Sequence, residues 1–130
     1  MLHRFEVNAA WVMGVALPLL ETLRRRTDFS NIPAYADDFV AGGLLLWAAA
    51  SVRRGRPDGR ARMVAAWGIL TGGGYYSFFG QVADLSAVDV SGLPGEWVAV
   101  IKAFMFVISL MSLILSVRAV GTGRATEASS

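Results

Sequence analysis

Four ionisable side chains could do chemistry if the fold brings them to one place: Glu21, Asp38, Asp84 and Lys102. Each stands toward one end of an apolar stretch, where a charged group that leaves water needs a partner. A lysine beside carboxylates in such a setting can relay protons or ions, and the carboxylates can act as acid or base. The same groups can also form an ion pair that only holds helices together. The residue types leave both interpretations open.

Two further polar groups extend this set of candidates. Tyr75 and Tyr76 fall inside an apolar stretch, where a phenol either bonds to a neighbouring helix or binds an oxygen of a ligand such as a quinone. Three consecutive arginines, Arg24, Arg25 and Arg26, end the first apolar stretch. Guanidinium groups at such a position bind anions or lipid head groups, or they anchor the chain at a membrane interface.

Several classes of site are excluded by the composition. The chain has no cysteine and one histidine, His3, so we predict no metal site and no cysteine nucleophile. We assign no catalytic residue from the sequence. The three glycines at 72–74 follow no expected strand and precede no lysine, so they do not form a phosphate-binding loop. The basic segment at 51–62 is too short to build a nucleic-acid surface. We predict no resident cofactor, and a quinone or another lipid-soluble ligand stays open.

The composition is typical of a membrane protein. Of the 130 residues, 55% are hydrophobic, and the mean hydropathy is +0.50. A helix needs ~20 mainly apolar residues to cross a bilayer. The sequence predicts an all-α, antiparallel bundle of four transmembrane helices within 1–118, followed by a disordered cytoplasmic tail at 119–130. The expected spans are 5–23, 39–52, 63–82 and 97–117.

The charges predict an orientation for this bundle. The segment at 51–62 holds five arginines and one aspartate, whereas 83–96 holds acidic residues and no basic one. The first should therefore face the cytoplasm, together with both termini, and Arg24 to Arg26 should face outward against the general trend. Asp37 and Asp38 are expected to cap the second helix, and residues 28–36 are expected to form a turn over the outer end.

Small residues mark one face of each expected span. Small side chains let helices approach closely in lipid, where the hydrophobic effect no longer drives association. We therefore expect these faces to point at one another. The helix-packing residues predicted in this way are Gly14, Gly42, Gly73, Ser77, Gly80, Ser109 and Ser112.

The layout resembles the DoxX-like group of small bacterial four-helix membrane proteins. The resemblance rests on Asp37 and Asp38 followed by Gly42, on the short basic loop, and on the glycines at 72–74, and it covers about residues 37–117. It implies an inner-membrane protein with a link to redox complexes or quinone chemistry. It assigns no catalytic residue.

The leading functional prediction is an accessory or scaffold subunit of the cell inner membrane that packs against itself or a larger membrane complex. An enzyme is the less favoured class. The first alternative is a protein that binds or transports a small molecule, an ion or protons through Glu21, Asp38, Asp84 and Lys102. The second is a membrane enzyme that acts on a lipid or quinone with the same carboxylates.

Overall fold

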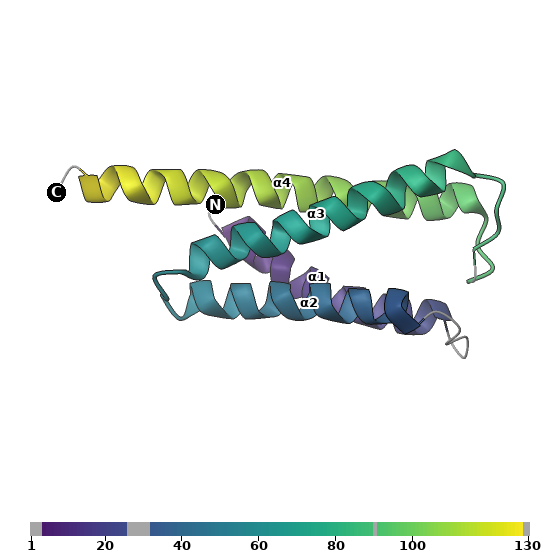
Figure 1. The fold of residues 1–130 in the computed structure, drawn as a ribbon, viewed down its shortest axis with the longest axis horizontal. Coiled ribbons are helices and arrows are strands. Elements are labelled where there is room, and N and C mark those ends of the chain that lie inside the picture. Colours follow the sequence, from purple (N-terminus) through teal and green to yellow (C-terminus); the bar gives the residue numbers. More distant parts are fainter. Residues whose placement is uncertain (1–3, 26–31, 90, 129–130) are drawn as a thin grey trace.

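The computed structural model describes residues 4–25, 32–89 and 91–128, and within these ranges the chain is all-helical, without strands (Figure 1). Four helices follow one another: α1 (Phe5–Arg25), α2 (Ile32–Arg53), α3 (Gly59–Ala83) and α4 (Gly95–Ala128). The all-α class and the four helices expected from the sequence are therefore present.

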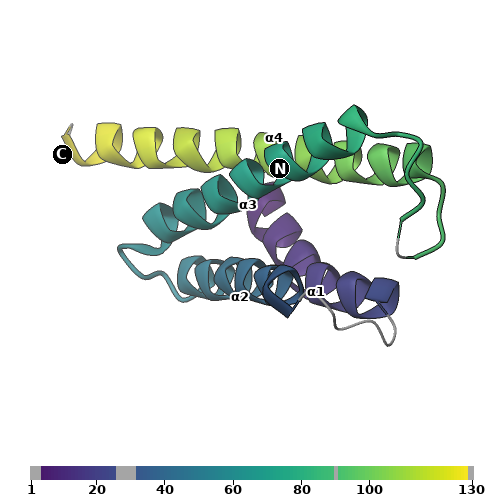
Figure 2. The same cartoon turned by 45° about the vertical axis from the view of Figure 1, so that its right-hand side comes forward.

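The helices form two antiparallel hairpins that diverge from a common joint. α1 packs against α2, and α3 packs against α4, while the turn at 54–58 joins the two hairpins. Figures 1 and 2 both show α3 leaving α2 at this turn and crossing toward α4. We call the end at the turn 54–58 the inner end, and the end at the loop 84–94 the outer end. The hairpins separate toward the outer end.

Two helix boundaries differ from the prediction. α2 begins at Ile32 instead of 39, so Asp37 and Asp38 lie inside the helix and do not cap it. Pro33 allows the earlier start, because proline is tolerated in the first turn of a helix. Residues 28–31 of the expected turn lie outside the described residues. α4 continues to Ala128, past the expected end at 117, so the segment predicted as a tail is helical as far as that residue.

The core lies where α1, α2 and α3 meet toward the inner end. Fully buried Trp67 and Met63 of α3 pack with buried residues of α1 and α2, which are mostly small on α2. Gly14 and Gly42 lie at the α1–α2 crossing, where a Cβ added at Gly42 would come within 2.6 Å of the Gly14 carbonyl oxygen. Their backbones touch because neither carries a side chain.

The glycines of α3 do not pack as predicted. A Cβ added at Gly73 or Gly80 would meet nothing within 4 Å, so neither glycine supports a close helix contact. Gly74 faces α4 instead, where an added Cβ would lie 3.5 Å from Phe106. Ser109 and Ser112 of α4 are buried, whereas Ser77 of α3 is exposed. The predicted face of α3 is rotated by one residue from the true contact with α4.

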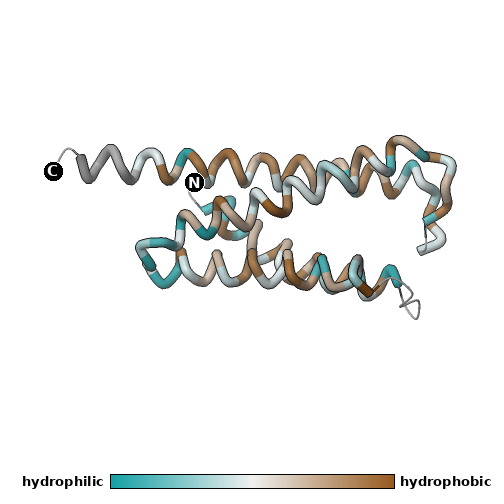
Figure 3. The backbone as a smooth tube through the Cα atoms, in the orientation of Figure 1, coloured by the Kyte–Doolittle hydropathy of each residue, from teal (hydrophilic) through white to brown (hydrophobic). Residues whose placement is uncertain are grey.

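Large apolar side chains cover the outside of all four helices. Examples that are more than half exposed are Val12, Leu23, Val40, Ile69, Phe104 and Val107. Figure 3 shows apolar residues along the helices and hydrophilic ones at the inner turn. In the described residues, one segment, Gly95–Thr122, is long and apolar enough to cross a membrane; its most apolar window is 22% buried. The other three helices fail this test, so the four-span membrane bundle and its multi-pass localisation stay predictions.

The α1–α2 crossing gives a test of the packing. Gly42→Ala should lower the stability by about 1 to 3 kcal/mol, because the new methyl group meets backbone atoms that cannot move aside. Gly43→Ala is the matched control, since an added Cβ there has nothing within 4 Å. Thermal unfolding of the purified protein in mild detergent measures both. Equal melting temperatures for the two variants would contradict the close crossing.

Candidate functional site

A cavity of about 440 Å³ lies between the two hairpins, toward the outer end. We call it the outer cavity. All four helices contribute to its wall, which combines charged, small and apolar side chains. The lining residues are Met13, Leu17, Glu21, Arg24, Arg25, Asp37, Asp38, Ala41, Ile69, Leu70, Gly73, Gly74, Ser77, Lys102, Met105, Phe106 and Ser109.

An adjoining cavity of about 390 Å³ lies against the loop that connects α3 to α4. Asp89, Ser91 and Leu93 of this loop form part of its wall. The two cavities have a common set of lining residues, which are Leu17, Glu21, Arg24, Asp38, Ser77, Lys102 and Met105. The two cavities therefore adjoin at the outer end, and the residues that line both include charged side chains.

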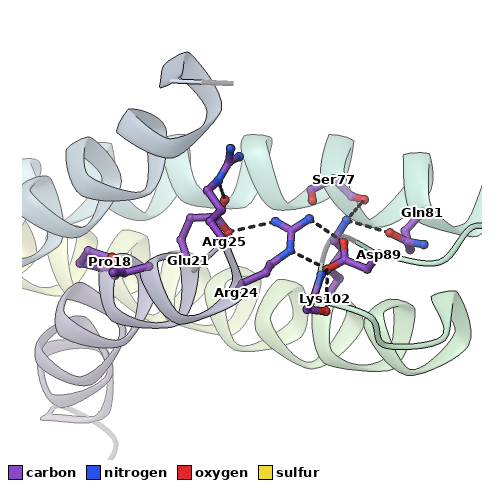
Figure 4. A network of polar contacts seen from close by, with 10 residues as sticks. Pro18, Glu21, Arg24, Arg25, Ser77, Gln81, Asp89 and Lys102 are labelled. Atoms are coloured by element: carbon purple, nitrogen blue, oxygen red, sulfur yellow. Dashed lines mark hydrogen bonds and ion pairs between the residues drawn. The ribbon is translucent and has the colours of Figure 1, made fainter. Parts of the chain in front are cut away.

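Arg24 connects the two hairpins across this space (Figure 4). Its Nε and Nη2 atoms donate hydrogen bonds of 2.8 and 2.6 Å to the two carboxylate oxygens of Asp89 in the α3–α4 loop. Its Nη1 atom donates to Glu21 of α1 at 2.9 Å. Arg25 also donates to Glu21. A bidentate arginine–carboxylate pair fixes orientation as well as distance.

The Asp89 carboxylate of this network stays ionised because of Arg24. The Arg24 hydrogen bonds hold the pKa of Asp89 well below its usual range, and those from Ser91 act in the same direction. The hydrogen bond to Asp89 in turn raises the pKa of Arg24 above its ordinary value. The side chains of Glu21 and Asp89 are 6% and 7% exposed, so the charges are largely removed from water.

Lys102 lies beside this network but does not pair with a carboxylate. Its ammonium group donates to the Gln81 side-chain oxygen at 3.0 Å and to the Ser77 carbonyl oxygen at 3.5 Å. In the described part of the chain, no carboxylate lies within ion-pair distance of it. The ion pair of Lys102 with a carboxylate that the sequence left open is therefore absent from the described residues. Glu21 pairs with Arg24 and Arg25, and Lys102 donates to the neutral groups of Gln81 and Ser77.

Asp38 enters the cavity wall from α2, just ahead of the apolar stretch 39–52. It is half-buried, and neither Asp38 nor the exposed Asp37 has a hydrogen bond or ion pair within the described ranges. Burial raises the pKa of Asp38 to about 6, and the negative charges of Glu21 and Asp37 add to the effect. The α2 side of the cavity therefore carries acidic groups without a paired cation.

Three other predicted candidates do not line either cavity. Asp84 follows the end of α3, is exposed, and accepts a hydrogen bond from Ser86 at 2.8 Å. Tyr75 and Tyr76 are exposed, and the ring of Tyr75 packs against Phe79. Their helical positions turn them away from Gly73 and Ser77, which line the cavity. Arg26 lies outside the described residues.

Sequence reasoning missed the loop residue that completes the network. Asp89 stands two residues before Ser91 and three before Gly92, and it accepts hydrogen bonds from the backbone and the hydroxyl of Ser91. Gly92 has a φ of 81°, which glycine adopts without strain. This spacing is a known turn pattern. It could have indicated an ordered loop, although not its partner Arg24.

A second missed pair lies toward the other end of the molecule. Glu6 of α1 is 1% exposed and accepts a hydrogen bond of 2.7 Å from Arg60 of α3. The signal was a single acidic residue at the start of the first apolar stretch, since such a residue needs a buried cation. The pair links the first turns of α1 and α3. The hairpins are therefore joined by an arginine–carboxylate contact at each end.

Comparison of the chain with protein families, with curated proteins and with solved structures finds no match. The resemblance to the DoxX-like group therefore stays a prediction, and the geometry of the outer cavity carries the functional inference.

The Arg24–Asp89 contact predicts a loss of stability when its carboxylate is neutralised. Asp89→Asn should lower the free energy of unfolding by about 1 to 3 kcal/mol, because Arg24 loses an ionic partner but stays 35% exposed to water. Asp84→Asn is the matched control, since among the described residues this exposed carboxylate bonds to Ser86 alone. Denaturant unfolding measures both variants. A loss as large for Asp84→Asn would contradict the assigned role of Asp89.

The same contact predicts a pH dependence. The pKa of Asp89 is lower in the folded state than in the unfolded chain, so the folded state holds the carboxylate ionised where the unfolded state already binds a proton. The stabilisation is complete above the unfolded pKa of about 4 and is lost as the pH falls below it. The difference between wild type and Asp89→Asn should therefore shrink in acid. A constant difference from neutral pH to the acid range would refute this origin.

Proposed function

We propose that the protein is a multi-pass protein of the cell inner membrane that binds a small lipid-soluble molecule in the outer cavity. The membrane part of the proposal is supported by the apolar side chains that all four helices expose. A contiguous apolar exterior of this extent is unusual for a soluble monomer. Charged side chains at the inner turn and around Arg24 would then lie near the two lipid–water interfaces.

The outer cavity is the observation that carries the binding function. Its volume of about 440 Å³ falls within the range of small-molecule sites, and its wall combines apolar side chains with a few charged ones. Gly73 leaves its part of the wall bare, because no atom outside its own segment lies within 4 Å of where its Cβ would be. The triple-glycine segment thus leaves space for a ligand at Gly73 and packs against α4 at Gly74.

Binding at this cavity is supported more strongly than catalysis by it. Both carboxylate oxygens of Glu21 accept hydrogen bonds from arginines, which leaves them poorly placed to contact a substrate. Tyr75 and Tyr76 do not line the cavity, so they offer no hydrogen bond to a quinone bound there. The membrane-enzyme alternative therefore has less support than a binding or transport protein.

An accessory subunit of a larger membrane complex, or of a homo-oligomer, is the second candidate. It is favoured by α4, whose apolar stretch is long and mostly uncovered by the rest of the chain. Gentle extraction followed by native mass spectrometry should then yield a complex in which α4 lies at the interface. A monomer that retains only small molecules would reject the subunit function and leave the binding function intact.

The binding function is tested by filling the cavity. Gly73→Leu should place an isobutyl group in the cavity and abolish retention of a lipid-soluble molecule, as read by native mass spectrometry of protein extracted from its own membrane. Gly72→Leu is the matched control, because Gly72 is exposed, has open space around it and does not line either cavity. Equal retention by both variants would exclude the outer cavity as the binding site.

A further inference from the structure

The ionisable groups of the outer cavity divide into paired and unpaired sets. Its wall holds three acidic and three basic side chains, which are Glu21, Asp37, Asp38, Arg24, Arg25 and Lys102. Arg24 and Arg25 both contact Glu21, and Arg24 also binds Asp89. In the described part of the chain this leaves Lys102 without a carboxylate and the two aspartates without a cation. One site therefore offers unpaired charges of both signs.

The unpaired charges belong to different hairpins. Lys102 stands on α4, and Asp38 stands on α2. The charges that act on Asp38 come from Glu21, Asp37, Arg24 and Arg25, whereas those that act on Lys102 come from Arg24, Asp89 and Glu21. The Glu21–Arg24 pair is common to both sets. Lys102 and Asp38 therefore both lie near this pair, and in the described residues they form no ion pair with each other.

Lys102 is oriented for an anionic oxygen. Gln81 and Ser77 accept two of the three hydrogen bonds that its ammonium group can donate, which orients the side chain (Figure 4). Among the described residues the third donor has no partner. A half-buried ammonium with neutral partners gains most from a charged acceptor such as a phosphate. Asp38, half-buried on the other wall, gains in the same way from an ammonium donor.

Most of the rest of the cavity wall is apolar, and Ser77 and Ser109 are its other polar residues. Leu17, Leu70, Met105 and Phe106 lie along it, and the bare backbone of Gly73 completes the surface. A hydrocarbon chain would remove these side chains from water at no cost in polar contacts. The whole site is therefore complementary to a molecule with an anionic oxygen, a cationic amine and an apolar body.

We propose that the outer cavity selects an amphiphile with a zwitterionic phosphate–amine head group, which places its phosphate at Lys102 and its ammonium at Asp38. This inference rests on the proposed binding function and specifies the ligand class for the same site. An anionic amphiphile would satisfy Lys102 and be repelled by the two aspartates. A cationic amphiphile would satisfy the aspartates and be repelled by Lys102.

The test compares three lipids with identical acyl chains in nanodiscs of otherwise uniform composition: phosphatidylethanolamine, phosphatidylglycerol and a trimethylammonium diacylglycerol. Native mass spectrometry counts the lipid retained by the full chain. Wild type should retain phosphatidylethanolamine at least about fivefold over the other two, which corresponds to ~1 kcal/mol. Equal retention of all three lipids would overturn the proposal.

Two variants test which side chain binds the phosphate and which binds the ammonium group of the lipid. Lys102→Met should shift the preference toward the cationic lipid, and Asp38→Asn should shift it toward the anionic one. Asp84→Asn, in an exposed carboxylate outside both cavities, is the matched control and should keep the wild-type preference. The two variants should shift the lipid preference in opposite directions, and a general loss of folding would not produce such a result. Unchanged preferences in both would overturn the assignment.

Two further arms separate the possible failures. Soluble glycerophosphoethanolamine carries the same head group without chains, and binding of it as tight as that of the lipid would overturn the assignment of an amphiphile. If Gly73→Leu abolishes retention but wild type shows no head-group preference, the ligand class is wrong and the binding function stands. If wild type and Gly73→Leu retain every lipid equally, both fail.

Discussion

The architecture depends on a single guanidinium group that joins two diverging hairpins at their open end. Arg24 belongs to the α1–α2 hairpin and reaches Asp89 in the loop of the α3–α4 hairpin, while a third hydrogen bond ties it to Glu21. The Glu21 and Asp89 side chains are largely shielded from water, and removing one partner of such an ion pair is costly. The contact therefore fixes how far apart the hairpins stand, and with it the size of the cavity between them.

Small residues serve opposite purposes in the two hairpins. Gly14 and Gly42 bring the α1 and α2 backbones into contact, so that hairpin is tightly closed at this crossing. Gly74 serves the same purpose between α3 and α4, but its neighbour Gly73 faces open space and lines the cavity. One short glycine run thus packs a helix on one side and shapes a binding surface on the other.

The sequence was sufficient to predict helices and their number, because the lengths of apolar segments are local properties. It grouped Glu21, Asp38, Asp84 and Lys102 as candidates for one site, and all of them except Asp84 line one cavity. It failed where the contact depends on how a helix is rotated about its axis or on residues far apart in the sequence. A one-residue rotation of α3 separates Gly73 from Gly74, and the choice of Arg24 over Lys102 as partner of Glu21 depends on a loop contact 65 residues away.

The separation of the hairpins beside the outer cavity is tested most directly by cysteine crosslinking between its walls. Ala41 of α2 and Gly73 of α3 both line the cavity, and a disulfide forms only when Cα atoms come within about 7 Å. We predict that oxidation leaves an Ala41→Cys/Gly73→Cys protein unlinked in a bilayer, whereas a long bismaleimide joins the two helices. A Gly74→Cys/Ser109→Cys pair at the α3–α4 contact should oxidise readily. Rapid disulfide formation between positions 41 and 73 would contradict an open cavity.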